Sequence, residues 1–433
     1  MQRATLALVC WIFGAGLAAA GEAAADHAET REREVSLDEI VAFAERHAPA
    51  IALASRQRAY ALAERRGAEP WLRDNPRLEL GVGPRFTGGG TDVDAFAALE
   101  QPIEIGGQRA RRLTAAERAA ERAAAEIAAV RWEVRRDVVL AYHAAVIARE
   151  RLELARRMVV LSEALLTAAE RRLAAGDVSA IEVLTARAEL AETRHEALRA
   201  SEAFRVARLE LARTAGWPLS APPQVSGVLD PPGPVPSLDD VLRSSKGRHP
   251  ELVLRQAAVR EASARVAVAD RTAWPSPTLG VEVAREGAPG GAPSTILLGT
   301  VGMPLPIFRK EQGGRATARA AVDVSRTEAA IAARALEAGL VRAHAALAGA
   351  AERIALLTTS GVPPVEEALA LSMRGFDAGE VPLADVIALR ERLLSVRLEL
   401  LDAHEDHARA LAELEFAAGA ALSRAPSGSG AQR

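Results

Sequence analysis

Two histidines near the end of the chain have the spacing of metal ligands. His404 and His407 are three residues apart, so on a helix their imidazole rings would share one face and could bind zinc or a similar ion. His407 also continues a heptad stripe of apolar residues after Leu400 and Ala403, and such positions are packing positions. We therefore expect the two histidines to pack within a helical bundle and not to hold a metal.

Few other residues are candidates for chemistry. Cys10 is the only cysteine, so no disulfide framework and no thiolate metal site is expected. Four methionines, one of them Met1, do not support a methionine-lined copper route. The sequence has no nucleophile–base pairing, no phosphate-binding loop and no cluster of metal ligands. We predict that the protein is not an enzyme and that it binds no cofactor.

The charge of the chain excludes another class of partner. With 54 basic and 57 acidic residues the net charge is -3, so the chain lacks the basic field that nucleic-acid binding requires. Aromatic residues make up 3% and charged residues 26% of a chain dominated by alanine. This balance is typical of long packed helices.

The first residues have the pattern of a secretory signal. Arg3 is followed by an apolar segment over residues 4–17 and by three alanines at 18–20, a small-residue cleavage site. The apolar run is shorter than the ~20 residues of a membrane-spanning helix, and no later segment reaches that length. We predict a signal peptide over residues 1–20. The residue before Cys10 is not the small one that usually precedes a lipidated cysteine, yet lipidation of Cys10 stays open.

The rest of the chain contains one pattern twice, about two hundred residues apart. Residues 36–40 (SLDEI) return as 237–241 (SLDDV), and residues 175–178 (AGDV) return as 378–381 (AGEV). Each copy predicts a helix, a β-hairpin and a long helical hairpin, which is a duplicated module too long for a solenoid repeat. The expected parts are a first repeat (36–216), a proline-rich connector (217–236), a second repeat (237–424) and a flexible tail (425–433).

The helical hairpins are expected to be very long. No proline and only four glycines interrupt residues 103–217, which predicts a helix from Gln108 to Ala174, a turn at Gly176 and a stop at Gly216. Such a helix would be roughly 100 Å long, so it must pack as a coiled-coil arm. Apolar residues recur at steps of three and four, at Leu154, Met158, Leu161 and Leu165 and again at Val386, Leu389, Leu393, Val396 and Leu400. Residues 361–364 (GVPP) predict a kink or short break in the second hairpin.

The predicted strands have one apolar and one polar face. Leu78, Leu80, Val82 and Phe86 alternate with Arg77, Glu79, Gly81, Gly83 and Arg85. Strands of about ten residues with this alternation match a transmembrane β-barrel, although a small soluble sheet alternates identically. The leader and the presence of only two hairpins favour the barrel. Four strands cannot close one and an open edge is not tolerated in lipid, so several subunits are required.

Taken together, these motifs resemble the TolC-type outer membrane efflux proteins. The resemblance rests on the paired helix starts at 37–40 and 238–241, the two strand pairs, and the tips at 175–178 and 378–381, in this order and duplicated. It implies a mainly α protein with a small β part, a homotrimer whose twelve strands form one outer-membrane β-barrel continued by a long α-helical barrel in the periplasm. A periplasmic adaptor (a membrane fusion protein) and an inner-membrane RND-type pump are the implied partners.

Two segments are similar to the CzcC-like, heavy-metal-efflux branch of this family. They are residues 101–109 (QPIEIGGQR) and 301–313 (VGMPLPIFRKEQG). Lys310 and Glu311 depart mildly from the branch, which usually has an acidic residue or asparagine before the final Gln-Gly. The resemblance implies export of heavy-metal cations, with multidrug export, type I secretion or a non-channel periplasmic scaffold as alternatives.

The resemblance also implies a periplasmic gate. In this family acidic side chains just past the second tip narrow the channel. Asp385 matches the first such position, Ala388 occupies the second, and Glu182 is the first-repeat equivalent of Asp385. A ring of carboxylates would attract cations. Alternatively, the two acids pair with Arg187 and Arg390 on solvated helix faces.

The two tips are the implied contacts of the adaptor. Small residues would allow another helical hairpin to approach closely, and glycine supplies the positive φ of an ordinary helix C-cap. The residues concerned are Ala175, Gly176 and Asp177 in the first repeat and Ala378, Gly379 and Glu380 in the second. Trp71 and Trp274, which precede the strands, are candidates either for anchors at the membrane interface or for packing below the barrel.

Overall fold

The computed structural model describes residues 34–422 except 230, 246, 248, 289–290 and 309. The predicted signal peptide, Cys10 and the predicted tail at 425–433 lie outside the described residues. The chain forms two compact units, and each contains parts of both repeats. The strand unit comprises the described residues of 53–129 and 250–334, and the helical unit comprises those of 34–52, 130–249 and 335–422.

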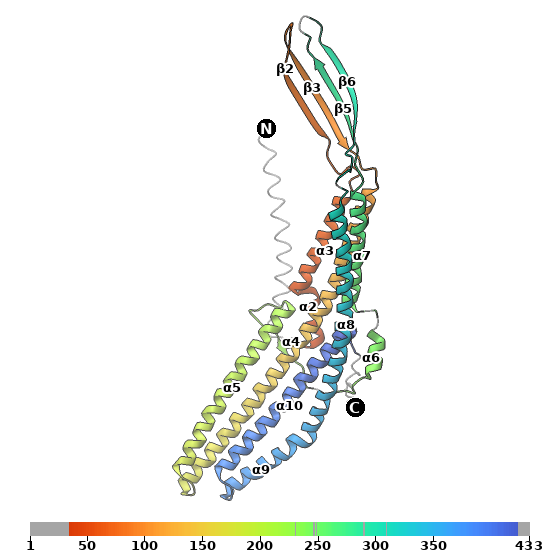
Figure 1. Ribbon diagram of the computed structural model, residues 1–433. Coiled ribbons are helices and arrows are strands. Elements are labelled where there is room, and N and C mark those ends of the chain that lie inside the picture. The colour runs from red at the N-terminus through yellow and green to blue at the C-terminus, as the bar shows by residue number, and fades with distance from the viewer. Residues whose placement is uncertain are drawn as a thin grey trace, which may run out of the picture. The chain divides into compact units, whose positions relative to one another are not determined.

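The strand unit contains a four-stranded antiparallel sheet in the order β2-β3-β5-β6 (Figure 1). Its strands are β2 (Arg77–Thr87), β3 (Gly90–Pro102), β5 (Thr278–Glu286) and β6 (Ser294–Gly302). The first repeat contributes β2 and β3, the second contributes β5 and β6, and the pairing of β3 with β5 joins them. Two helices lead into the hairpins, α3 (Pro49–Ala68) and α7 (Pro250–Thr272).

The register of the sheet collects the apolar side chains on one face. Leu80 is opposite Ala97, which is opposite Val283, which is opposite Leu297. Leu80 is 70% exposed and Leu297 is 71% exposed, so the described part of the chain leaves this face uncovered. The alternation predicted for β2 and β3 is confirmed, because the opposite face carries Arg77, Glu79, Arg85, Asp94, Glu100 and Glu282. Arg285 of β5 is an exception, since it lies on the apolar face opposite Ala95.

The polar face also contains one closely packed position. At Gly81 a Cβ atom would lie 2.1 Å from Cε1 of Phe96, the residue directly opposite on β3. The phenyl ring therefore lies against the backbone of β2, and only glycine allows this approach. Near the β2–β3 turn, Arg85 forms ion pairs with Asp94 (2.9 Å) and Glu286 (3.2 Å), which ties β2, β3 and β5 together.

The helical unit is built from two long hairpins (Figure 1). The first contains α4 (Gln108–Ala175), which begins in the strand unit, and α5 (Ala180–Ala215). The second contains α8 (Gln312–Leu356), η1 (Leu357–Gly361), α9 (Val362–Ala378) and α10 (Leu383–Ala418). Gly176, Gly216 and Gly379 have φ of +86°, +75° and +80°, so the predicted turns and stop are confirmed. Among the described helices, none combines the length and the apolar composition needed to cross a membrane.

The remaining small elements belong to the helical unit. They are β1 (Glu34–Val35), paired in parallel with β4 (Gln224–Val225), α2 (Leu37–His47) and α6 (Leu238–Ser245). Ser36 and Glu39 form a reciprocal capping box at the start of α2. The helix then packs its apolar face on a core that includes Tyr142 and Trp217.

The heptad positions predicted from the sequence form the core of the hairpins. Leu154, Met158 and Leu165 of α4 are buried against Val386, Leu393 and Val396 of α10, with Leu161, Leu389 and Leu400 partly buried beside them. Burial of large aliphatic side chains of this kind contributes about 1.5–3 kcal/mol each. The coiled-coil prediction for both hairpins is therefore confirmed.

The predicted kink takes the form of a π-helical turn. Buried or partly buried residues recur at 340, 343, 347, 350 and 354 in α8, at 357 in η1, and at 362, 365, 369, 372 and 376 in α9. Steps of three and four are thus broken by one step of five, across η1. A π-turn accommodates one extra residue, so the apolar stripe faces α10 both before and after the insertion. Pro363 and Pro364 follow, and neither can donate a backbone hydrogen bond.

The two faces of the sheet predict opposite responses to charge. Arginine in place of Leu80 or Val82 would lie on the apolar face, which costs about 2–4 kcal/mol per residue at the middle of a bilayer. We expect these variants to lose the heat-modifiable, membrane-inserted form on gel electrophoresis. Glu79→Arg, on the other face of the same strand, should retain that form. Equal loss from both faces would contradict the assignment of the apolar face.

Candidate functional site

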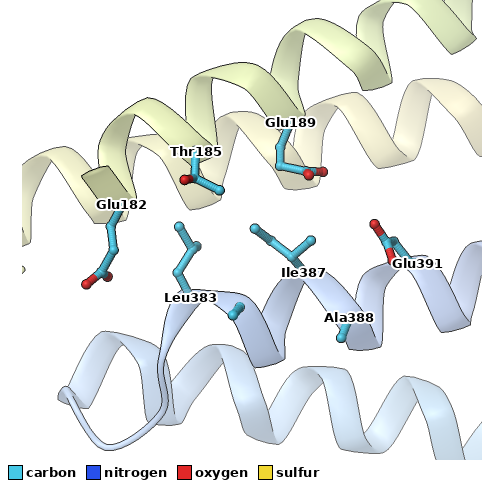
Figure 2. A pocket seen from close by; sticks show the side chains of 8 residues that line it. Glu182, Thr185, Glu189, Leu383, Ile387, Ala388 and Glu391 are labelled. Carbon is cyan, nitrogen blue, oxygen red and sulfur yellow. The ribbon is translucent and has the colours of Figure 1, made fainter. Parts of the chain in front are cut away.

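A groove lies near the tips of the hairpins, between the first turns of α5 and α10. Its walls are lined by Glu182, Thr185, Glu189, Leu383, Ala384, Ile387, Ala388 and Glu391 (Figure 2). Glu182 and Glu189 come from α5, while Glu391 comes from α10. Three carboxylates thus border a groove whose other lining side chains, apart from Thr185, are aliphatic.

The two acids predicted as gate residues occupy equivalent places in the two hairpins. Glu182 lies in the first turn of α5 and Asp385 in the first turn of α10. Glu182 is half-buried and lines the groove, whereas Asp385 is exposed and is not among the lining residues. The partial positive charge of a helix N-terminus favours a carboxylate at both places.

The arginines considered as partners of these acids are engaged elsewhere. Arg187 forms its ion pair with Glu170, at 2.8 Å, and Arg390 forms its ion pair with Glu189, at 2.6 Å. Within residues 34–422, apart from the six undescribed positions, no ion pair involves Glu182 or Asp385. In this structure, therefore, neither Arg187 nor Arg390 pairs with Glu182 or Asp385.

Arg390 is instead the centre of a buried polar network. Its guanidinium donates to Ser162 Oγ (2.7 Å), to Thr193 Oγ1 (2.8 Å) and to Glu189 (2.6 Å). Ser162 belongs to α4, Thr193 and Glu189 belong to α5, and Arg390 belongs to α10. The side chain of Arg390 is 8% exposed, so the second hairpin is joined to the first by charge-assisted hydrogen bonds removed from water.

Sequence reasoning missed this network. A signal was present, because Arg390 lies in the apolar stripe of α10, between Val386 and Leu393, where a charged residue requires buried partners. The partners themselves could not be identified from the sequence, since Ser162 and Thr193 are 228 and 197 residues away.

The tip residues are all exposed. Ala175, Gly176, Asp177, Ala378, Gly379 and Glu380 have open surfaces in the single chain. The turns are closed by Asp177 N–H donating to Arg172 O (2.9 Å) and Glu380 N–H donating to Gly375 O (2.8 Å). A Cβ atom at Gly176 would meet nothing within 4 Å. Arg172 also donates to Phe376 O at 3.0 Å, which holds the tip of the first hairpin against that of the second.

The histidine pair lies well away from the tips. His404 and His407 are half-buried on α10, and burial lowers the pKa of both, with the neighbouring His404 lowering the pKa of His407 further. Ion pairs of Arg151 with Asp402 and Glu405 surround them. Among the described residues, no group of three or more histidine, cysteine, aspartate or glutamate side chains is placed to hold a metal ion.

Comparison with known proteins assigns this architecture to a family. Residues 72–217 and 241–420, well over half of the chain, match the model of a family described as outer membrane efflux protein. The chain belongs to this family. The sequence-based prediction of a TolC-type outer membrane efflux protein is confirmed.

Individual relatives agree with the family. The cobalt-zinc-cadmium resistance protein CzcC of Cupriavidus metallidurans is 30% identical over 309 residues, which span 70% of this chain and 72% of CzcC. The outer membrane channel CmeC of Campylobacter jejuni has the same fold, with a TM-score of 0.73 at 16% identity over 88% of this chain and 85% of CmeC. CusC has a TM-score of 0.72 at 16% identity, over 90% and 94% of the two chains.

Membership of this family indicates where in the cell envelope the sheet and the helical hairpins lie. An outer membrane efflux protein is a channel and not an enzyme, as predicted. The four-stranded sheet of the strand unit is the part of the β-barrel that this chain contributes in the outer membrane, and the helical hairpins form the periplasmic tunnel. The tips and the groove between α5 and α10 therefore lie in the periplasm.

The buried network predicts that replacing Glu189 alone destabilises the protein more than replacing Glu189 and Arg390 together. Glu189→Met should destabilise the protein by about 3 kcal/mol, the lower end for a broken buried pair because Glu189 is 22% exposed. The double variant with Arg390→Met should recover part of this loss, since no buried charge is left unpaired. Urea unfolding of the purified protein, followed by circular dichroism, measures both.

The exposed pair Glu163–Arg194 provides the control, because it also involves a glutamate and an arginine that bridge two helices of this unit, α4 and α5. Glu163→Met should cost less than about 1 kcal/mol. If the two glutamate variants lose stability equally, the network does not join the hairpins as described.

Proposed function

We propose that this outer membrane efflux protein is the exit channel of a tripartite RND-type system that exports heavy-metal cations. The observation that carries the proposal is the 30% identity with CzcC, a protein named for cobalt, zinc and cadmium resistance, over 70% of this chain. The carboxylates near the periplasmic tips support it, because fixed negative charge favours the passage of cations.

The channel is proposed to be a homotrimer. Four strands are too few to close a barrel, and β2 and β6 lie at the two ends of the strand order. In a bilayer each unpaired backbone group costs several kcal/mol, so a sheet edge there must be paired. Three copies supply twelve strands, an even number within the known range of outer-membrane barrels. Outer membrane lipid would then cover the apolar face of the sheet.

Glu182 and Asp385 are proposed to border the periplasmic gate. Three copies would provide six carboxylates at the level of the tips, none of them neutralised by Arg187 or Arg390. Their charge would be screened least where the passage is narrowest. With Ala388 at the second family position, the gate depends on one acid per hairpin.

A periplasmic adaptor is proposed to contact the two tips. All six tip residues are exposed, and the open surface at Gly176 leaves room for a helical hairpin of the adaptor to approach the backbone. The inner-membrane pump would supply the energy, so the channel needs only a weak and reversible preference for its substrate.

The gate predicts a change in ion selectivity. Glu182→Lys together with Asp385→Lys should reverse a cation preference into an anion preference, because the sign of the charge at the constriction changes. Reversal potentials of single channels in a planar bilayer under a salt gradient measure the preference. Glu192→Lys with Glu399→Lys makes the same change in net charge on exposed turns of α5 and α10 farther from the tips. Unchanged reversal potentials for the first pair would remove Glu182 and Asp385 from the gate.

The substrate and docking proposals are tested together in cells. Deleting the gene should sensitise the host to cobalt, zinc or cadmium, and the wild-type gene should restore growth. Gly176→Trp with Gly379→Trp should fail to restore it while trimers remain in the outer membrane, because both tips become bulky and both glycines have positive φ. Gly88→Trp, in the β2–β3 turn, is the control.

Two results separate the parts of this proposal. If the deletion strain shows unaltered metal sensitivity but becomes more sensitive to drugs, the proposed substrate class would be drugs and not heavy-metal cations. Full resistance with tryptophan at both tips would exclude the tips as the adaptor contact.

A further inference from the structure

The periplasmic end of the sheet contains a close junction between the two repeats. Where the chain leaves β3, Ile103 N–H donates to Pro277 O at 2.8 Å. Gly106 lies so near Trp274 that a Cβ atom would be 2.8 Å from Cβ of the indole side chain. Gln108 Nε2 donates to Trp274 O at 3.4 Å. The segment after the last strand of one repeat therefore packs against the tryptophan before the first strand of the next.

A tryptophan before the first strand of a repeat and a segment after the last strand also occur at the outer edges of the sheet, but there they do not contact each other. Trp71 lies six residues before the start of β2 and Trp274 four residues before the start of β5, and residues 303–305 follow β6 as Ile103 follows β3. Trp71 is 76% exposed, and the apolar side chains after β6 are exposed as well, with Phe308 at 91%. The order β2-β3-β5-β6 places these two halves of a junction at opposite edges.

We propose that Trp71 of one copy packs against residues 303–308 of the neighbouring copy, forming a clasp between subunits at the periplasmic rim of the barrel. The clasp rests on the homotrimer proposed above. When β6 of one copy pairs with β2 of the next, the end of β6 meets the start of β2, as the end of β3 meets the start of β5 within the chain. The structure within one chain is thus the template for the contact between chains.

The repeat correspondence assigns the main contacts. Leu305 corresponds to Ile103 and Pro76 to Pro277, so Leu305 N–H of one copy donates to Pro76 O of the next. Phe308 lies where the first repeat has its glycines. A phenyl ring there can cover the exposed indole of Trp71, which an offset or edge-to-face pair would stabilise beyond the area it buries.

A second copy fits this surface better than lipid does. The exposed side chains are divided between the two edges, with Trp71 at one and residues 303–308 at the other. Within the chain, a tryptophan before a strand (Trp274) already packs against the segment that follows β3. In addition, the edges β2 and β6 must be joined if the backbone groups in the bilayer are to be satisfied.

Cysteine pairs test the clasp in the full-length protein in its own membrane. In a Cys10→Ala background, Trp71→Cys with Phe308→Cys should give covalent dimers and trimers on non-reducing gels after mild oxidation, and neither single variant should. Pro76→Cys with Leu305→Cys is a second pair, useful if the loss of Trp71 weakens folding. Gly106→Cys with Trp274→Cys is the matched intrachain control, which should lose its free thiols without any gain in mass.

The outcomes separate the clasp from the proposed function. Heat-modifiable trimers with normal export, but no crosslink from either pair, would overturn the clasp and leave the channel intact. Quenching of a bimane label on Phe308→Cys by brominated phospholipid in such trimers would show that residues 303–308 contact lipid instead. If the wild-type protein contains only monomers, the homotrimer fails and the clasp fails with it.

Discussion

The pairing of backbone hydrogen-bonding groups in the outer membrane is the constraint on which the rest of this structure depends. A strand in lipid has no water to satisfy its amides and carbonyls, so every strand needs a neighbour on both sides. This chain supplies four strands, and the order β2-β3-β5-β6 pairs β3 and β5 on both sides. In the proposed homotrimer, the edges β2 and β6 find their partners in other copies. Folding to the functional state would then be tied to association, and the stability of the channel would depend on the concentration of its subunits.

The internal duplication means that one type of contact, between the hairpins of successive repeats, can satisfy the backbone groups of all strands. Each repeat contributes one β-hairpin and one helical hairpin, and the contact between β3 and β5 is already a junction between repeats. A trimer would therefore consist of six similar modules, with three junctions inside chains and three between them. The covalent link gives the junction inside the chain an effective concentration that the proposed junctions between chains lack.

Much of the fold follows from local patterns that a sequence displays directly. The period-two alternation around Leu80 identified the lipid face, and the heptads around Leu154 and Val386 identified the core of the hairpins. Gly176 and Gly379 marked the turns because a positive φ there favours glycine. These features depend on neighbours in the chain, so their residue types are sufficient to predict them.

The candidate site was predicted less completely because it depends on contacts between distant residues. Glu182 and Asp385 could be placed one turn past each tip, yet the partners of Arg187 and Arg390 could not be chosen among many acids on neighbouring turns. Likewise, Gly81 gave no sign that Phe96 would fill the space beside it. In each case the answer depends on the register between two segments, and a difference of one residue would change it.

The single step of five in the apolar stripe has a mechanical consequence. An α-helix is stiff because each turn is bonded to the next, and a curved or bent helix must lengthen or lose some of these bonds. At η1 the turn is wider, and Pro363 and Pro364 withdraw two donors from the carbonyls before them. The first hairpin has no such interruption, since α4 runs unbroken from Gln108 to Ala175. The weakest backbone hydrogen bonding of the second hairpin is thus concentrated at one level, about five helical turns from its tip.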